Sequence, residues 1–132
     1  MKIKIGDEAS LTKQFTIEDI ETFARIAGDE NPLHLDQDFA RNTVFGKRIA
    51  HGLLVAGLIS AVIGNQMPGR GSVYLNQTLT FKKPVFPNDK ITARVTVTNI
   101  KESKNIYTLA TRCLNQNNET VIEGEAIIML PA

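Results

Sequence analysis

The sequence has few of the residues on which disulfide, metal and nucleic-acid chemistry depend. Its 132 residues include one cysteine, Cys113, two histidines and no tryptophan. A single cysteine cannot form a disulfide within the chain or a cysteine-rich zinc site, which fits a cytoplasmic protein, and we expect Cys113 to be a core or strand residue. Fifteen Lys and Arg residues against fourteen Asp and Glu residues leave a net charge of +1. We therefore expect no nucleic-acid partner and no charge-driven binding to membranes.

Long apolar runs are also absent. The most apolar stretch, residues 53–63, is interrupted by Ser60 and is shorter than the roughly 20 residues that a membrane helix needs. The N-terminus turns acidic where a secretory signal would be apolar, so we expect no export signal. With 42% hydrophobic and 22% charged residues, the chain has the length and composition of one globular domain over residues 1–132.

The first half of the chain carries the periodicity of helices. Residues 17–27 place apolar side chains at helical spacing, between Thr16 as a candidate cap and Gly28 as a natural stop. A short helix is expected after Asp36. Residues 51–64 are apolar nearly all round, which predicts a helix surrounded by other elements.

The second half carries the patterns of strands. Four segments alternate apolar and polar residues or are rich in strand formers, namely 73–82, 91–98, 107–114 and 122–130. Turn-forming residues separate these segments, so we predict a meandering antiparallel sheet. Helices followed by strands indicate an α+β fold, in which one antiparallel sheet wraps around the long apolar helix.

Asp29 and His34 are the first candidates for chemistry. Residues 28–34 read Gly-Asp-Glu-Asn-Pro-Leu-His, and the proline disfavours helical geometry at the preceding residue, so both candidates are expected on a loop. On a continuous helix their side chains would point about 140° apart. A turn can bring them together as a base and a hydrogen-bonding partner for a water molecule. Alternatively, Asp29 only caps amides of the turn.

The start of the apolar helix offers a second set of candidates. The amides of its first turn have no partner within the helix. Gly52 has no side chain to block a ligand, so its N–H could bind a developing oxyanion; alternatively, the glycine only permits a tight entry into the helix. If Ser60 is buried, its hydroxyl must bond either to a carbonyl one turn earlier or to Asp29, which it would then orient.

Motifs of other reaction classes are missing. The sequence has no Gly-x-x-x-x-Gly-Lys-[Ser/Thr] loop and no Gly-x-Ser-x-Gly elbow, which argues against nucleotide hydrolysis and serine-hydrolase chemistry. Two histidines and one cysteine make a poor set of metal ligands, so we expect no metal. We expect Lys47, Arg48, Lys82 and Lys83 to lie on the solvated surface.

Two motifs resemble those of a known family. The Asp-x-Asn-Pro-x-His segment at 29–34 and the His-Gly pair at 51–52 look like those of the MaoC-like (R)-specific enoyl-CoA hydratases, in particular the short bacterial members. Residues 58–60, 71–75 and 81–89 are also similar. The resemblance implies a single MaoC-like hot-dog domain that pairs as a homodimer through its sheets.

The resemblance also implies an activity and roles for four residues. The reaction would be the reversible addition of water to a trans-2-enoyl-CoA to give an (R)-3-hydroxyacyl-CoA, a lyase reaction of fatty-acid metabolism. Asp29 and His34 would activate the water, the Gly52 N–H would bind the oxyanion, and Ser60 would orient Asp29. No cofactor is implied, because coenzyme A is part of the substrate.

Hot-dog domains serve other functions as well, so the fold alone does not decide among them. An acyl-CoA thioesterase would keep the oxyanion glycine and a carboxylate but would not need a histidine at the spacing of His34. A non-catalytic acyl-CoA-binding module is the third alternative.

Overall fold

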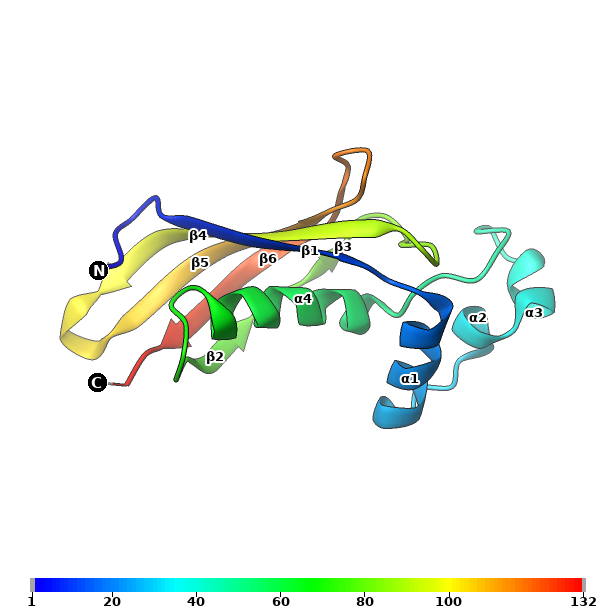
Figure 1. The fold of residues 1–132 in the computed structure, drawn as a ribbon, viewed down its shortest axis with the longest axis horizontal. Coiled ribbons are helices and arrows are strands. Elements are labelled where there is room, and N and C mark those ends of the chain that lie inside the picture. Colours follow the sequence, from blue (N-terminus) through cyan, green and yellow to red (C-terminus); the bar gives the residue numbers. More distant parts are fainter. Residues whose placement is uncertain (1, 132) are drawn as a thin grey trace.

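The computed structural model describes residues 2–131, and Figure 1 shows a curved sheet, one long helix and a group of shorter helices at one end. In chain order the elements are β1 (Glu8–Gln14), α1 (Ile17–Ala27), α2 (Pro32–Leu35), α3 (Gln37–Arg41), α4 (Gly52–Asn65), β2 (Val73–Gln77), β3 (Thr80–Phe81), β4 (Lys90–Lys101), the 3-10 helix η1 (Glu102–Lys104), β5 (Ile106–Leu114) and β6 (Thr120–Met129). Within the described range, no helix combines the length and apolarity needed to cross a membrane.

The strands form one six-stranded sheet in the order β1-β4-β5-β6-β2, and β3 also pairs with β6. All these pairings are antiparallel. The long helix α4 runs along one face of the sheet (Figure 1). The predicted α+β fold, an antiparallel sheet around a long apolar helix, is therefore confirmed.

The core lies between this face of the sheet and α4. Strand β4 alternates in burial, and its inward side chains Ile91, Ala93, Val95 and Val97 are all buried. On α4, Val55 and Ile59 belong to the same buried cluster. Burying one side chain of this kind stabilises the fold by about 1.5–3 kcal/mol, so the layer holds α4 firmly along the sheet.

One side of α4 is not covered by the rest of the chain. Leu53, Gly57, Ser60 and Gly64 are exposed, and their spacing of three or four residues places them along one stripe of the helix. The prediction that other elements surround this helix is therefore wrong for the single chain. A sheet can cover only one side of a helix, although this helix is apolar on every side.

Two strand predictions are also corrected. Residues 73–82, expected as one strand, form β2 and β3 with a break between them. At the break the Thr78 N–H donates to the Glu125 carbonyl at 2.9 Å, and any side chain at Gly124 would overlap the Thr78 backbone. The N-terminal segment, expected only as a short extended start, forms β1 and pairs with β4 along its whole length.

Helices α1, α2 and α3 form an overhang that extends beyond the N-terminal end of α4 (Figure 1). The predicted cap is present, because Thr16 accepts from the Asp19 N–H and the Asp19 carboxylate accepts from the Thr16 N–H. Gly28 ends α1 at a φ of 77°, a left-handed conformation that favours glycine. The short helix predicted after Asp36 is α3, and the Asp36 carboxylate caps it.

Candidate active site

The turn between α1 and α2 brings Asp29 close to His34. The Asp29 carboxylate accepts from the Asn31 N–H at 3.3 Å, and the Asn31 side chain in turn accepts from the Leu33 N–H at 3.1 Å. Pro32 begins α2, where its missing N–H costs no hydrogen bond. Asp29 thus lies on a loop, as predicted, whereas His34 lies in a one-turn helix that the sequence did not reveal.

His34 is held in one orientation and one tautomer. Its side chain is buried, and its Nδ1 lies 2.7 Å from the Ile49 carbonyl. A carbonyl can only accept, so Nδ1 carries the proton and, in the neutral ring, Nε2 is left as an acceptor. An acceptor of this kind can take a hydrogen bond, and then a proton, from a water molecule.

His51 completes the cluster, and the sequence had placed it only at the start of a helix. It is 2% exposed, and its Nε2 donates to the main-chain carbonyl of Asp29 at 3.1 Å. Its ring stacks on His34 at 3.9 Å between centroids. Burial lowers the pKa of His51, more than the hydrogen bond to Asp29 raises it, so the ring is neutral at pH 7.

The polar ends of the three side chains converge. One ligand atom from each of Asp29, His34 and His51 lies within 4.8 Å of the others. Asp29 is exposed while both imidazoles are buried, so the carboxylate faces the opening of the site. Carboxylate and imidazole acceptors at this separation can hold one water molecule between them.

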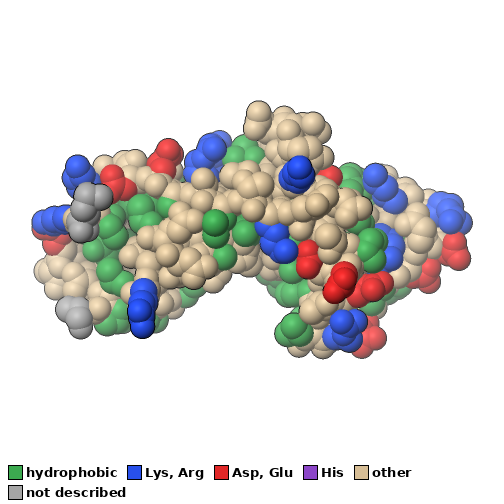
Figure 2. Space-filling view, viewed as in Figure 1, with side chains coloured by type: hydrophobic (Ala, Val, Ile, Leu, Met, Phe, Trp, Pro, Cys, Tyr) green, Lys and Arg blue, Asp and Glu red, His purple; other side chains and the backbone are tan. Residues whose placement is uncertain are grey.

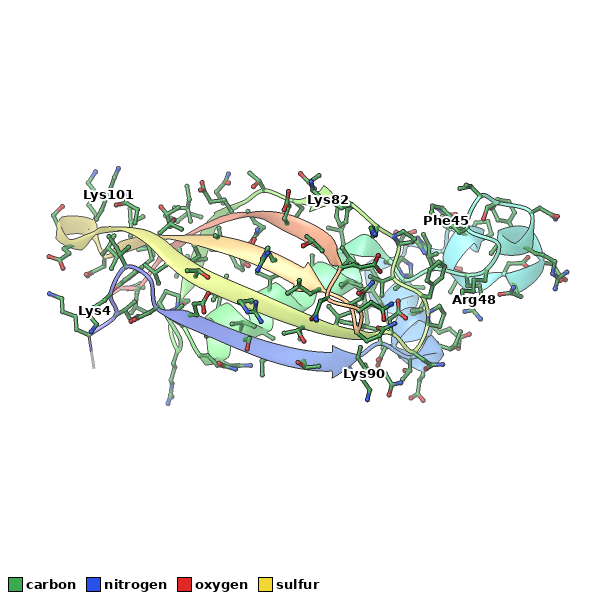
Figure 3. All side chains as sticks on the ribbon, turned by 90° about the horizontal axis from the view of Figure 1, so that it is seen from above. Lys4, Phe45, Arg48, Lys82, Lys90 and Lys101 are labelled. Carbon is green, nitrogen blue, oxygen red and sulfur yellow. The ribbon has the colours of Figure 1, made fainter. Side chains whose placement is uncertain are left out.

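These residues form the polar end of a pocket of about 510 Å³. Its other walls are mostly apolar, which suits a hydrophobic substrate. The apolar lining residues include Phe45, Ile49, Val55, Phe81, Val85 and Ile122. Figure 3 shows Phe45 at the end of the molecule that carries the overhang. The pocket therefore lies where the overhang meets the N-terminal end of α4.

Gly52 lines the same pocket as the first residue of α4. Its N–H belongs to the first turn, so the helix itself offers it no acceptor. A Cβ at this position would overlap the Phe81 ring. Its φ is not positive, so a strained helix entry does not require the glycine, but the close approach of Phe81 does.

Ser60 lies elsewhere. It is exposed on α4 and lines a second hollow of about 400 Å³, together with Leu53, Gly57 and residues 74–77 of β2. Eight residues separate it from Gly52, a distance of about 12 Å along a helix. Among residues 2–131, neither of the predicted hydrogen bonds of Ser60 is made, so a single chain does not bring Ser60 to Asp29.

Arg48 supports the site although it was expected on the solvated surface. Its side chain is only 13% exposed, and its Nε donates to the His34 carbonyl at 2.7 Å. The guanidinium also pairs with Glu21 of α1 at 3.4 Å. Charged residues near a motif are usually solvated, so nothing in the sequence indicated this contact.

The lysines near the pocket are placed as predicted. Lys82 and Lys83 line its rim, are exposed, and pair with Glu123 and Glu119 respectively. Figure 3 shows Lys82 at the edge of the sheet, beside β3. Lys47 is also exposed, with its ammonium 4.4 Å from the centre of the Phe86 ring.

Comparisons with known proteins agree on one family. The family model described as "MaoC like domain" matches residues 3–118. An (R)-specific enoyl-CoA hydratase of Aeromonas caviae is 46% identical over 98% of this chain and 96% of its own length. One from Rhodospirillum rubrum is 49% identical, over 98% and 90%. The solved structure of the (R)-hydratase from A. caviae superposes with a TM-score of 0.94 and covers 98% of both chains.

Proposed function

We propose how this chain, which belongs to the MaoC-like domain family, adds water to its substrate. By its full-length similarity to such enzymes it is an (R)-specific enoyl-CoA hydratase. In this proposal, Asp29 and His34 bind and activate the water molecule that the enzyme adds. The observation that carries this assignment is the convergence of the Asp29 carboxylate and the His34 ring at the polar end of an apolar pocket. Water needs a base, and a carboxylate or the unprotonated nitrogen of an imidazole can serve as one.

The addition requires three movements of charge. The water oxygen forms a bond to the β-carbon of the enoyl thioester, and its proton passes to Asp29 or His34. Electrons of the carbon–carbon double bond move toward the thioester oxygen, where the N–H of Gly52 stabilises the negative charge. The proton taken up by Asp29 or His34 then returns to the α-carbon while the thioester carbonyl re-forms, and the product is the (R)-3-hydroxyacyl-CoA.

The reaction uses no metal or other cofactor in this proposal. The rings of His34 and His51 are stacked, with an angle of 30° between their planes. His51 donates its Nε2 to the Asp29 carbonyl and its Nδ1 is buried, so His51 offers no accessible nitrogen to a metal. The arrangement therefore suits a water molecule better than a metal ion shared by both histidines.

We propose that two copies of the chain pair through β2 and the exposed stripe of α4. Strand β2 ends the sheet order, and its Val73, Tyr74 and Leu75 are exposed. Beside it on α4 lies Leu53, which is 63% exposed. Figure 2 shows patches of hydrophobic side chains at the surface of the half that contains the sheet and α4. An unpaired edge beside such a surface favours pairing with a second copy.

This pairing would also give Ser60 a role. When the two β2 strands pair antiparallel about a twofold axis perpendicular to the sheet, the two α4 helices also run antiparallel, so the C-terminal half of one lies beside the N-terminal end of the other. Ser60 of one copy would then approach the Asp29 of the second copy. The glycines of the stripe allow the helices to come close.

Mixed dimers test this role of Ser60. Asp29→Asn and Ser60→Ala subunits, each impaired alone, are unfolded together and refolded. If Ser60 acts across the interface, the mixed dimer contains one site with both changes and one intact site, so activity returns. If no activity returns although mixed dimers form, Ser60 does not act on the Asp29 of the other copy.

We place the protein in the cytoplasm. Its one thiol, Cys113, is free and buried, and burial raises its pKa to about 12. A chain with one buried cysteine needs no oxidising compartment to form a disulfide, which supports a reducing cytoplasm.

One assay separates the proposed function from its alternatives. The purified protein is mixed with crotonyl-CoA, and the enoyl absorbance and free thiol are followed together. Loss of absorbance without release of thiol indicates hydration. Release of thiol indicates a thioesterase, and tight binding with neither change indicates a non-catalytic acyl-CoA-binding module.

A further inference from the structure

His51 joins three parts of the overhang to the start of α4. It immediately precedes the first residue of α4, its ring stacks on His34 of α2, and Phe23 of α1 lies 4.8 Å away between ring centroids. Its Nε2 reaches the Asp29 carbonyl. From these contacts we infer that His51 is a positioning residue, which holds Asp29 and His34 at the separation that water activation needs.

The hydrogen bond fixes a residue that has little other support. Asp29 is exposed and follows Gly28, where α1 ends. Among the described residues, its carboxylate accepts a hydrogen bond only within the turn, from the Asn31 N–H. Within residues 2–131, the bond from His51 is the hydrogen bond that ties Asp29 to another element. Loss of this bond would let the carboxylate move relative to His34.

The stacked ring fixes the other partner. The His34 ring is anchored at its Nδ1 by Ile49, which still permits the ring to tilt about that bond. The His51 ring covers one face of His34 and limits this tilt. A neutral ring is required in this place, because a charged imidazolium on His51 would repel a proton arriving on His34.

The packing of His51 shows that it is not optimised for stability. Its Nδ1 is buried and has no hydrogen-bond partner within the described chain. A buried polar atom without a partner destabilises the folded state, and an apolar ring of the same shape would remove this cost. A histidine in this place is therefore better explained by its contacts with Asp29 and His34 than by stability.

Two variants separate the two contacts. His51→Phe keeps an aromatic ring against His34 but cannot donate to Asp29. His51→Gln can donate from its side-chain amide, which reaches about as far as Nε2, but cannot stack. The matched control is Val97→Ala, a core truncation on β4 outside the site, which lowers stability without altering the Asp29 loop.

The expected effect of the His51 variants on kcat rests on the proposed function. With crotonyl-CoA, His51→Phe should lower kcat by about tenfold to a hundredfold, as expected for a small misplacement of catalytic groups, with KM nearly unchanged. Its melting temperature should stay close to that of the parent, because the loss of the bond to Asp29 is offset by removal of the unpartnered Nδ1. His51→Gln should recover part of kcat, and Val97→Ala should melt earlier yet keep the parent kcat.

A second readout does not depend on activity. Nuclear magnetic resonance relaxation of the backbone amides at residues 29–31 should show increased motion in His51→Phe and recovery in His51→Gln. An unchanged loop in His51→Phe, or a kcat equal to that of the parent, would overturn the inference. If the parent fails to hydrate crotonyl-CoA, the proposed function fails, and the relaxation data still decide whether His51 positions Asp29.

Discussion

Asp29→Asn is the substitution that bears most directly on the proposed water activation. The asparagine oxygen can still accept from the Asn31 N–H, a contact of 3.3 Å in the parent, so the turn should remain. Asp29 is exposed, and a surface change of this kind usually alters the free energy of unfolding by about 0.5 kcal/mol or less. The amide cannot accept the proton of water, however, so kcat should fall by about 10² to 10⁴.

The assay follows hydration of crotonyl-CoA by the parent and the variant, with thermal melting measured on the same preparations. Asp38→Asn is the matched control, because it removes one exposed negative charge from the same overhang without touching the pocket. The control should keep the activity of the parent. Asp29→Asn with parental kcat, or with a loss of kcat explained by partial unfolding, would refute the assignment of Asp29 as a catalytic base.

Three further predictions concern the residues around Asp29 and His34. Gly52→Ala should lower kcat/KM at least about tenfold, because the new Cβ overlaps the Phe81 ring. Adding Phe81→Leu to the same chain should recover part of this loss. If kcat/KM does not recover, the overlap with Phe81 is not the cause of the loss. Arg48→Met should reduce the free energy of unfolding by about 1.5–3 kcal/mol and lower kcat, since the His34 carbonyl loses its charged donor. Glu21→Gln leaves that donor in place and should reduce the free energy of unfolding, measured in urea, by less than about 1 kcal/mol. The lowered pKa of His51 means that the unfolded chain binds a proton at this residue more readily than the folded chain does. The stability that comes from keeping His51 neutral is therefore complete above about pH 6.5. It is lost as the pH falls toward the pKa of His51 in the folded protein. Urea unfolding across this range should show a shallower pH dependence in His51→Phe, and an identical slope would show that His51 is not the group responsible.

The association of two copies has its own test. Light scattering after gel filtration should give twice the chain mass of 14.6 kDa. Leu75→Lys on β2 should shift the protein toward the monomer and lower its activity. Ile26→Lys on α1, where the parent side chain is even more exposed, should change neither. A monomeric parent with full activity would contradict the proposed pairing.

The local sequence was enough to predict a turn that can bring Asp29 and His34 together. Pro32 and the polar residues before it specify this turn within a few residues. The same holds for the cap at Thr16 and the stop at Gly28, because both depend on hydrogen bonds and backbone conformations of neighbouring residues.

Other features depend on contacts between distant segments and could not be read in this way. The stacking of His51 on His34 requires the path of residues 36–50, which no periodic pattern describes. Strand alternation continues through Thr78, and only the close approach of Gly124 shows why the strand breaks there. The side of α4 left exposed could not be predicted, since the helix is apolar on all sides and the sheet could have covered any of them.

The stereochemistry of hydration tests the central claim most directly. The purified protein is incubated with crotonyl-CoA, the product is hydrolysed, and the 3-hydroxybutyrate is resolved by chiral chromatography. If Asp29 and His34 deliver water from one wall of the pocket, a single enantiomer should form. By similarity to (R)-specific enoyl-CoA hydratases it should be the (R) enantiomer, and its formation should be strongly reduced in Asp29→Asn. Formation of the (S) enantiomer, of a racemate, or of no product would contradict the claim.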